Sequence, residues 1–200
     1  ITDEKIPEFK KIKKITLNKS LKLYKLNDKK NNFNILSHTF KGDSQILKIK
    51  YNNTIQDINL KLIGKIQLKN VIMAIIAAKQ SNIEITKILK VIPKIKSVEG
   101  RFQKIGKLKN QSKVILDYAH TPDALKTCLL NLREQFPNKK ISLLFGCGGN
   151  RDQNKRSKMG KIADNFSDKI YLTDDNPRYE NPEKIRKDIK KGINKQKIIE

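Results

Sequence analysis

The 200-residue chain is long enough for one large domain or two small ones, and we expect two. Its net charge of +24 comes from 44 Lys and Arg against 20 Asp and Glu, but few are Arg and no block of like charge is long enough for a nucleic-acid-binding arm. No apolar run approaches the roughly 18 residues of a membrane span, and the first residues lack a signal peptide's apolar core, so we expect a cytoplasmic protein without nucleic-acid or membrane partners.

The first part of the chain alternates polar and apolar residues in short runs, from about residue 13 to residue 63. Turn residues separate the runs, notably at 41–44 and 52–54. A period of two with such breaks predicts antiparallel strands joined by hairpins. The expected strands are 20–26, 33–40, 45–51 and 55–62.

The pattern changes at Gly64. Residues 68–80 are apolar nearly all round and rich in Ala, which predicts a helix buried in a core. A second helix is expected over 85–92, ending before Pro93. We expect the first domain to end at residue 96.

Residues 97–200 alternate strand and helix patterns. Strands are expected at 113–118, 141–145 and 169–173, and a further strand begins at Ile198. Helices are expected from Thr121-Pro122, near 158–166, and from Asn181-Pro182 to about Lys191, with Thr121 and Asn181 as caps. This alternation predicts a Rossmann-like α/β domain with a parallel sheet.

Three polar loops follow the expected strands, at 117–122, 146–152 and 173–178. Ligands of open α/β sheets bind beyond the carboxyl ends of the strands, so these loops are the candidate site. The Gly-rich run at 146–149 matches neither the phosphate loop nor the dinucleotide fingerprint. A ligand-binding loop and a tight turn that needs positive φ are equally good explanations of its glycines. Cys128 and Cys147 are too far apart, with too few His partners, for a zinc site, so we predict no metal site and two reduced thiols.

Five motifs occur together in these segments. They are Gly64-x5-Asn70, Glu99-Gly100-Arg101-Phe102, Asp117-Tyr118-Ala119-His120-Thr121-Pro122-Asp123, Phe145-Gly146-Cys147-Gly148-Gly149-x-Arg151-Asp152 and Asp174-Asp175-Asn176-Pro177-Arg178. In this order and spacing they resemble the Mur ligases over residues 62–199, and the match is nearest to members that use diaminopimelate. Residues 1–61 are similar only in style. The resemblance implies the end of a central ATP-binding domain with antiparallel hairpins in 1–96, and a truncated, Rossmann-like C-terminal domain in 97–200.

The resemblance implies an ATP-dependent ligase of peptidoglycan precursor synthesis. Such an enzyme transfers the γ-phosphoryl of ATP to the D-glutamate side chain of UDP-N-acetylmuramoyl-L-alanyl-D-glutamate, and the amine of meso-diaminopimelate then displaces phosphate. ATP and Mg²⁺ are the implied cofactors. The phosphate loop, the Mg²⁺ ligands and the UDP-sugar site would lie upstream of residue 1, so we expect this chain to be an inactive fragment. The whole protein is expected to be a monomer.

The resemblance also implies roles for individual residues. Asn70 would contact the adenine side of ATP, Asp117 the ribose, and Arg101 and His120 the phosphate region, the last two as catalytic residues. The implied diaminopimelate-binding residues are Arg151, Asp175, Asn176, Pro177 and Arg178. A planar guanidinium grips a carboxylate with two parallel hydrogen bonds, which suits the second carboxylate that distinguishes diaminopimelate from lysine. Three residues depart from the usual pattern of the family: Gln67 stands where Asn is usual, Gln103 where Glu is common, and Asn150 where Asp is frequent.

Other readings stay open. The chain could use lysine or another amino acid, or belong to a folylpolyglutamate synthetase. It could instead be a basic nucleic-acid-binding protein, or a non-catalytic α/β remnant. Each site residue also has a plainer explanation: Asn70 as a helix-start residue, Asp117 as a turn cap, Arg101 and His120 as surface or capping residues, and Arg178 as part of a solvated turn.

Overall fold

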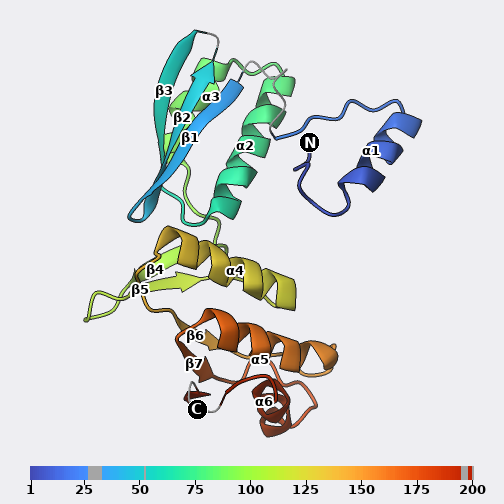
Figure 1. Ribbon diagram of the computed structural model, residues 1–200, viewed down its shortest axis with the longest axis vertical. Coiled ribbons are helices and arrows are strands. Elements are labelled where there is room, and N and C mark those ends of the chain that lie inside the picture. The colour runs from blue at the N-terminus through green and yellow to red at the C-terminus, as the bar shows by residue number, and fades with distance from the viewer. Residues whose placement is uncertain (27–32, 52, 195–197, 200) are drawn as a thin grey trace. The chain divides into compact units, whose positions relative to one another are not determined.

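The computed structural model describes residues 1–26, 33–51, 53–194 and 198–199, and its chain divides into two compact units. The first unit is Ile1–Val114 and the second is Ile115–Glu200 (Figure 1). Two units were expected. Compactness alone does not fix a domain border, so the border expected after residue 96 stays a prediction.

The first unit contains an antiparallel sheet of three strands in the order β1-β2-β3. These strands are β1 (Phe33–Lys41), β2 (Ser44–Tyr51) and β3 (Thr54–Leu60), which confirms three of the expected strands. Lys41 pairs with Ser44 across the first hairpin, and Gly42 turns the chain with a φ of 57°. Asn52, in the second expected turn, lies outside the described residues.

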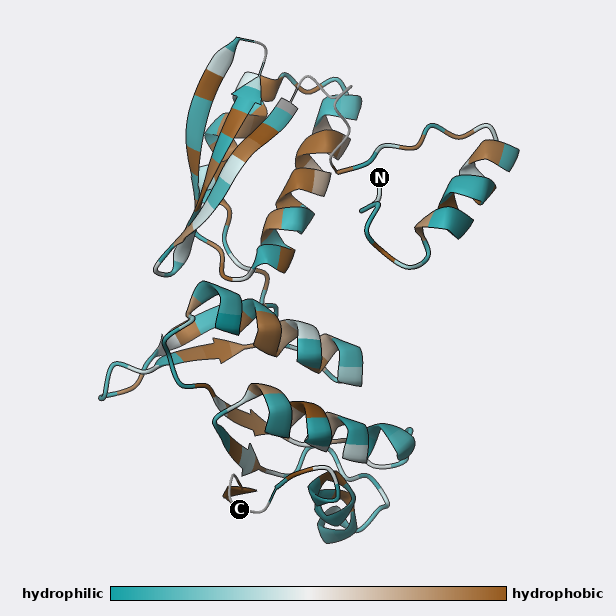
Figure 2. Cartoon of the chain, viewed as in Figure 1, coloured by the Kyte–Doolittle hydropathy of each residue, from teal (hydrophilic) through white to brown (hydrophobic). Residues whose placement is uncertain are grey.

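Two helices and a short 3₁₀ turn share a core with this sheet (Figures 1 and 2). They are α2 (Lys65–Gln80), α3 (Ile85–Val91) and η1 (Ile92–Lys94), close to the expected helices. Hydrophobic residues run along α2, as the sequence pattern predicts for a buried helix. The core combines strand residues with helix residues: Leu47, Ile49, Ile58 and Leu60 with Leu68, Val71, Ile72, Ile75, Ile76, Ile85, Leu89 and Ile92.

The N-terminal segment differs from the prediction. A helix, α1 (Phe9–Asn18), occupies part of the region read as alternating strands, and all ten of its residues are at least partly exposed. The prediction of a strand at 20–26 is wrong: Ser20 leaves the helix with a φ of 52°, and residues 20–26, all of them described, form no strand beyond an isolated bridge between Lys25 and Thr2. Phe9, Ile12 and Ile15 are spaced by three residues, which is typical of a helix and does not fit the alternation of a strand.

The second unit has a parallel sheet in the order β6-β7-β8. Its strands are β6 (Ser142–Phe145), β7 (Lys169–Leu172) and β8 (Ile198–Ile199). The parallel α/β architecture is therefore confirmed. The expected strand at 113–118 appears as β5 (Lys113–Leu116), but it pairs with β4 (Gln103–Lys107) in a separate two-stranded sheet. The sequence pattern did not predict β4.

Three helices accompany the parallel sheet: α4 (Pro122–Gln135), α5 (Asn154–Phe166) and α6 (Pro182–Lys190). Two of them begin with the predicted caps. The Thr121 hydroxyl accepts from the Ala124 N–H at 3.3 Å, and the Asn181 side chain accepts from the Glu183 N–H at 2.8 Å. Helix and strand residues share one core, which includes Leu129, Met159, Ala163, Ile170, Ile185 and Ile189. Among the helices in the described part of the chain, none is both long and apolar enough to cross a membrane.

Candidate functional site

The loops that follow β6 and β7 lie at the same edge of the parallel sheet, because the two strands run in the same direction. These are the Gly-rich loop (residues 146–152) and the Asn-Pro-Arg loop (residues 173–180). Their backbones meet directly: the Gly149 N–H donates to the Asn176 carbonyl at 2.9 Å. The structure therefore brings together the two loops that carry the predicted amino-acid-binding residues.

Close approach of backbone explains the glycines of the Gly-rich loop. A Cβ on Gly149 would lie 1.9 Å from the Pro177 carbonyl oxygen, and one on Gly146 would lie 2.3 Å from the Thr173 carbonyl oxygen. None of Gly146, Gly148 and Gly149, all within the described range 53–194, has a left-handed φ. The alternative of a turn that needs positive φ is therefore wrong, and these residues are small so that the Asn-Pro-Arg loop can press against them.

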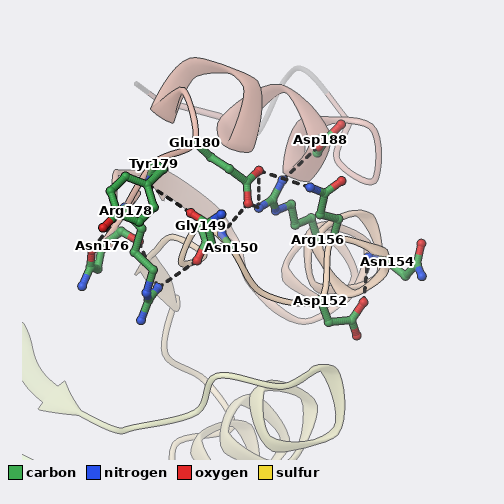
Figure 3. Close-up of polar contacts among 11 residues, drawn as sticks. Gly149, Asn150, Asp152, Asn154, Arg156, Asn176, Arg178, Tyr179, Glu180 and Asp188 are labelled. Carbon is green, nitrogen blue, oxygen red and sulfur yellow. Dashed lines mark hydrogen bonds and ion pairs between the residues drawn. The ribbon is translucent and has the colours of Figure 1, made fainter.

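Arg178 reaches from the Asn-Pro-Arg loop to the Gly-rich loop. Its Nη1 donates to the Gly149 carbonyl at 2.9 Å and to the Asn176 carbonyl at 3.3 Å (Figure 3). The residue is exposed and has a φ of 52°, a conformation that costs a non-glycine residue about 1–2 kcal/mol. Both contacts use Nη1 of a group with five N–H donors, so one corner of the guanidinium is anchored and the in-plane N–H groups of Nε and Nη2 are the donors proposed for a carboxylate.

Arg151 is exposed and directly follows Asn150, whose side chain joins the two loops. The Asn150 side chain accepts from the Tyr179 N–H at 3.0 Å (Figure 3). Asn150 precedes Arg151 and Tyr179 follows Arg178, so the two arginines are chain neighbours of a hydrogen-bonded pair. The backbones at 151 and 178 are thereby held close to each other.

The other predicted substrate residues shape the Asn-Pro-Arg loop. The Asn176 side chain accepts from the Arg178 N–H at 3.3 Å, and the Pro177 carbonyl accepts from the Glu180 N–H at 3.0 Å. Asp175 is exposed, and a Cβ on Gly148 would lie 3.6 Å from its Oδ2. These contacts fix a turn on which the Asp175 carboxylate and the Arg178 guanidinium lie three residues apart.

Asp117 and His120 lie in the loop between β5 and α4. The Asp117 side chain accepts from the Ala119 N–H at 3.0 Å, which is the turn-capping contact of the plainer explanation. His120 is exposed, and its Nδ1 lies 3.1 Å from the Tyr118 carbonyl oxygen. Lys155 of α5 donates to the His120 carbonyl at 2.7 Å, so this loop is tied to the helix that follows the Gly-rich loop.

Asn70 and Arg101 lie in the first unit, and both are exposed. The Gln67 side chain donates to the Arg101 carbonyl at 2.9 Å, which places Arg101 beside the first turn of α2. Buried Gln45 donates to the carbonyls of Leu62 and Gly64, at 2.9 and 3.1 Å, and so fixes the start of the same helix. The four predicted nucleotide contacts are thus divided between the two units, and their common site stays a prediction.

The three departures from the family pattern each make a defined hydrogen bond. Gln67 holds the Arg101 carbonyl, Gln103 accepts from the Gly100 N–H at 2.9 Å, and Asn150 accepts from Tyr179. In each of the last two the side-chain oxygen does what a carboxylate oxygen would do, but without the charge.

Arg156, on α5, was not singled out from the sequence. Its side chain is 0 % exposed, and its Nη2 lies 2.9 Å from each carboxylate oxygen of Glu180 (Figure 3). Its Nη1 lies 3.2 Å from Asp188. An Arg within a Lys-rich helix is typical of a surface residue, and no local pattern distinguishes this one, because Glu180 lies 24 residues further along the chain.

Two electrostatic shifts follow from this packing. The Asn150 N–H, and after it the Arg156 guanidinium, hold the pKa of Glu180 below its ordinary value. Burial raises the pKa of the Cys128 thiol to about 12, and the negative charge of Asp117 adds to the effect. Burial also raises the pKa of Cys147. Both thiols are protonated at neutral pH, which makes them packing groups and poor nucleophiles.

No group of three or more His, Cys, Asp or Glu side chains within residues 1–26, 33–51, 53–194 and 198–199 is arranged to hold a metal ion. The described donors fit an anionic ligand better. Arg151 and Arg178 carry guanidinium groups on the two adjoining loops.

Comparison with known proteins identifies the family. Residues 100–200 match the family model for the Mur ligase, glutamate ligase domain, and the chain belongs to the Mur ligase family. It is 38% identical over 175 residues to the UDP-N-acetylmuramoyl-L-alanyl-D-glutamate–2,6-diaminopimelate ligase of Rickettsia typhi, covering 82% of this chain and 35% of that protein. The ligase of the same name from Buchnera aphidicola subsp. Baizongia pistaciae is 45% identical over 145 residues, which cover 71% of this chain and 28% of the relative. The chain spans about a third of the length of these relatives.

Solved structures agree with the fold. A structure of a UDP-N-acetylmuramoyl-L-alanyl-D-glutamate–2,6-diaminopimelate ligase superimposes with a TM-score of 0.62 at 30% identity, over 96% of this chain and 40% of the other. A folylpolyglutamate synthase of Mycobacterium tuberculosis with bound ADP gives 0.74 at 15% identity, over 96% and 42%. At that identity the second likeness shows the fold alone.

Proposed function

We propose that this chain is part of an ATP-dependent ligase that adds meso-diaminopimelate to UDP-N-acetylmuramoyl-L-alanyl-D-glutamate. The observation that carries the proposal is the direct joining of the Gly-rich loop to the Asn-Pro-Arg loop, with Arg151 and Arg178 beside the joint. Relatives that match 71–82% of this chain have this activity in their names. On this reading residues 1–96 end the central domain and 97–200 belong to the C-terminal domain, which the family match from residue 100 supports.

The proposed reaction has two steps. An oxygen of the D-glutamate side-chain carboxylate attacks the γ-phosphorus of ATP, ADP leaves, and an acyl phosphate forms. The amine of diaminopimelate then attacks the carbonyl carbon, a C–N bond forms, the bond from that carbon to the phosphate oxygen breaks, and the nitrogen loses a proton. Holding the amine close to the activated carbonyl is the main task of the amino-acid site.

The amino-acid site distinguishes diaminopimelate by its second carboxylate. We assign the recognition of this group to the guanidinium groups of Arg178 and Arg151, with the Asp175 carboxylate available for an ammonium group of the same substrate. Arg151 and Arg178 are exposed in the chain without ligand, and a bound amino acid would cover them. Lysine would leave the covered guanidinium groups without an anion, and truncating one partner of a desolvated charge pair costs about 2–5 kcal/mol. The site is thus expected to select against lysine.

Nucleotide binding is proposed for four residues outside this pair of loops: Asn70, Arg101, Asp117 and His120. Arg101 and His120 carry groups that can donate to phosphate oxygens, and Asp117 can accept from a ribose hydroxyl. Mg²⁺, where bound, would offset the charge of the transferred phosphoryl group. Solved relatives of the fold include a complex with ADP, which supports a nucleotide site in the wider group.

The test is incorporation of labelled amino acid by the complete gene product that contains this chain. The purified protein is incubated with ATP, Mg²⁺ and UDP-N-acetylmuramoyl-L-alanyl-D-glutamate, together with labelled meso-diaminopimelate or lysine, and the nucleotide-linked product is counted. We expect ATP-dependent incorporation of diaminopimelate with release of ADP and phosphate. Equal use of lysine, or incorporation of another amino acid only, would contradict the assignment.

A further inference from the structure

An ion-pair network with a fully buried arginine at its centre contacts the two loops of the proposed amino-acid site. Its centre is Arg156, which contacts Glu180 with Nη2 and Asp188 with Nη1. Lys191 lies 2.7 Å from the other oxygen of Asp188, so two cations balance two carboxylates. Removing a guanidinium from water costs several kcal/mol, and a fold retains it only where its partners are held in good geometry.

Glu180 connects this network to the Gly-rich loop. Its Oε1 accepts a hydrogen bond from the Asn150 N–H, and its Oε2 accepts from the Gln153 side chain at 3.3 Å. The same two oxygens face Nη2 of Arg156. One carboxylate from the Asn-Pro-Arg loop therefore joins the start of α5 to the backbone of the Gly-rich loop (Figure 3).

The joined residues flank the two proposed substrate arginines. Asn150 immediately precedes Arg151, and Glu180 follows Arg178 by two residues. The separation between Arg151 and Arg178 therefore depends on where the Glu180 carboxylate is held. We propose that Arg156 is a positioning residue: by holding Glu180, it sets the spacing of the two loops and so the fit of the amino-acid site to a dicarboxylate substrate. The part about substrate rests on the proposed function.

Asp188, the other partner of Arg156, connects α6 to α5, and among the described residues its ion pairs are with Arg156 and Lys191 rather than with the two loops. It lies on α6, which packs tightly on α5: a Cβ on Gly160 would lie 2.1 Å from the Ile189 carbonyl oxygen. Asp188 thus links helix to helix, whereas Glu180 links helix to loops. Asp188→Asn is therefore a matched control, since it removes a charge from the same guanidinium and leaves the loop contacts in place.

The experiment compares four variants of the complete gene product: Arg156→Lys, Glu180→Gln, Asp188→Asn and Arg133→Lys. The last alters a partly exposed arginine on α4, paired with Asp168 at 2.9 Å, outside the network. The first readout is amide hydrogen exchange in residues 146–152 and 173–180. We expect about tenfold faster exchange there in Arg156→Lys and Glu180→Gln, and wild-type exchange in these two loops in both controls.

The second readout is steady-state kinetics. Misplacing the substrate arginines should raise the KM for diaminopimelate about tenfold in Arg156→Lys and Glu180→Gln, while the KM for ATP stays within about twofold. The preference for diaminopimelate over lysine should fall in parallel. A double variant, Arg156→Gln with Glu180→Gln, places two neutral amides together and should recover part of the loss, because no uncompensated buried charge remains.

Each result decides the question. Unchanged exchange in both loops would overturn the proposal, as would equal rises of both KM values with faster exchange throughout the unit, which is the behaviour of a general stability defect. If the wild-type protein does not use diaminopimelate, the proposed function fails, and the exchange data still show whether Arg156 holds the loops. Faster loop exchange with an unaltered KM for diaminopimelate would contradict the substrate part of the proposal alone.

Discussion

Arg178 and Gly149 are joined by a hydrogen bond of 2.9 Å from the arginine Nη1 to the glycine carbonyl oxygen. The bond crosses from one loop to the other, so the direction of the guanidinium is set by the backbone of the neighbouring loop. Selectivity of the amino-acid site should therefore respond to changes in the Gly-rich loop as well as to changes at Arg178 itself.

Gly149→Ala should destabilise the second unit. The new Cβ would lie 1.9 Å from the Pro177 carbonyl oxygen, and because that neighbour is backbone the two loops must separate. We expect a loss of about 1–3 kcal/mol in the free energy of unfolding, measured by urea denaturation. Gly106→Ala is the control, since its Cβ would have no heavy atom within 4 Å among the described residues. Equal stability of the two variants would show that the loops do not press together.

Gly148→Ala should weaken substrate binding without destabilising the fold. Its Cβ would lie 2.9 Å from Nη1 of Arg178, the far end of a flexible side chain that can move away. The displaced guanidinium should raise the KM for diaminopimelate about tenfold, with a KM for ATP close to that of the wild type. An unaltered KM for diaminopimelate, measured in the complete gene product, would argue against a role for Arg178 in binding.

Thr121→Ala removes the cap of α4. The hydroxyl accepts from the Ala124 N–H, and loss of such a cap costs about 1 kcal/mol of stability. Thr127→Ala, at an exposed position within the same helix, is the matched control and should be neutral or slightly stabilising. Thermal unfolding followed by circular dichroism distinguishes the two, and identical melting temperatures would contradict the assigned cap.

Neither thiol should react in the folded protein. Burial and the charge of Asp117 raise the pKa of Cys128 to about 12, and burial raises that of Cys147, so the nucleophilic thiolate is scarce at pH 8. Ellman's reagent should label both residues in urea and neither in buffer. Rapid labelling of the folded chain, lost in Cys128→Ser, would show that the helix around this residue opens readily.

Local chemistry made much of the fold predictable from sequence. The caps at Thr121 and Asn181 and the turn at Gly42 are each determined by a few neighbouring residues, and they appear where the sequence places them. Helix α1 and strand β5 show the limit of such reasoning. In α1 the spacing of apolar residues fits two periods, and the partner of β5 depends on contacts that its four residues do not encode.

The candidate site divides in the same way. The motifs at 146–152 and 174–178 identify the loops, because each follows an expected strand of the parallel sheet, where ligands of such sheets bind. Arg156 could not be recognised, since its burial results from Glu180 and Asp188 on segments distant in sequence. The close approach of the Pro177 carbonyl, which explains the glycines, exists only in the folded unit, so a turn with positive φ was the one structural alternative that the sequence suggested.

The role of Arg178 in recognising the second carboxylate is tested most directly by measuring the substrate selectivity of Arg178→Ala in the complete gene product. The measured quantity is the ratio of kcat/KM for meso-diaminopimelate to kcat/KM for lysine, with Arg133→Ala as the control. A guanidinium that binds the second carboxylate contributes about 2–4 kcal/mol to this ratio, so Arg178→Ala should lower it by about 30-fold or more. A ratio equal to that of the wild type would contradict the claim that Arg178 recognises the substrate.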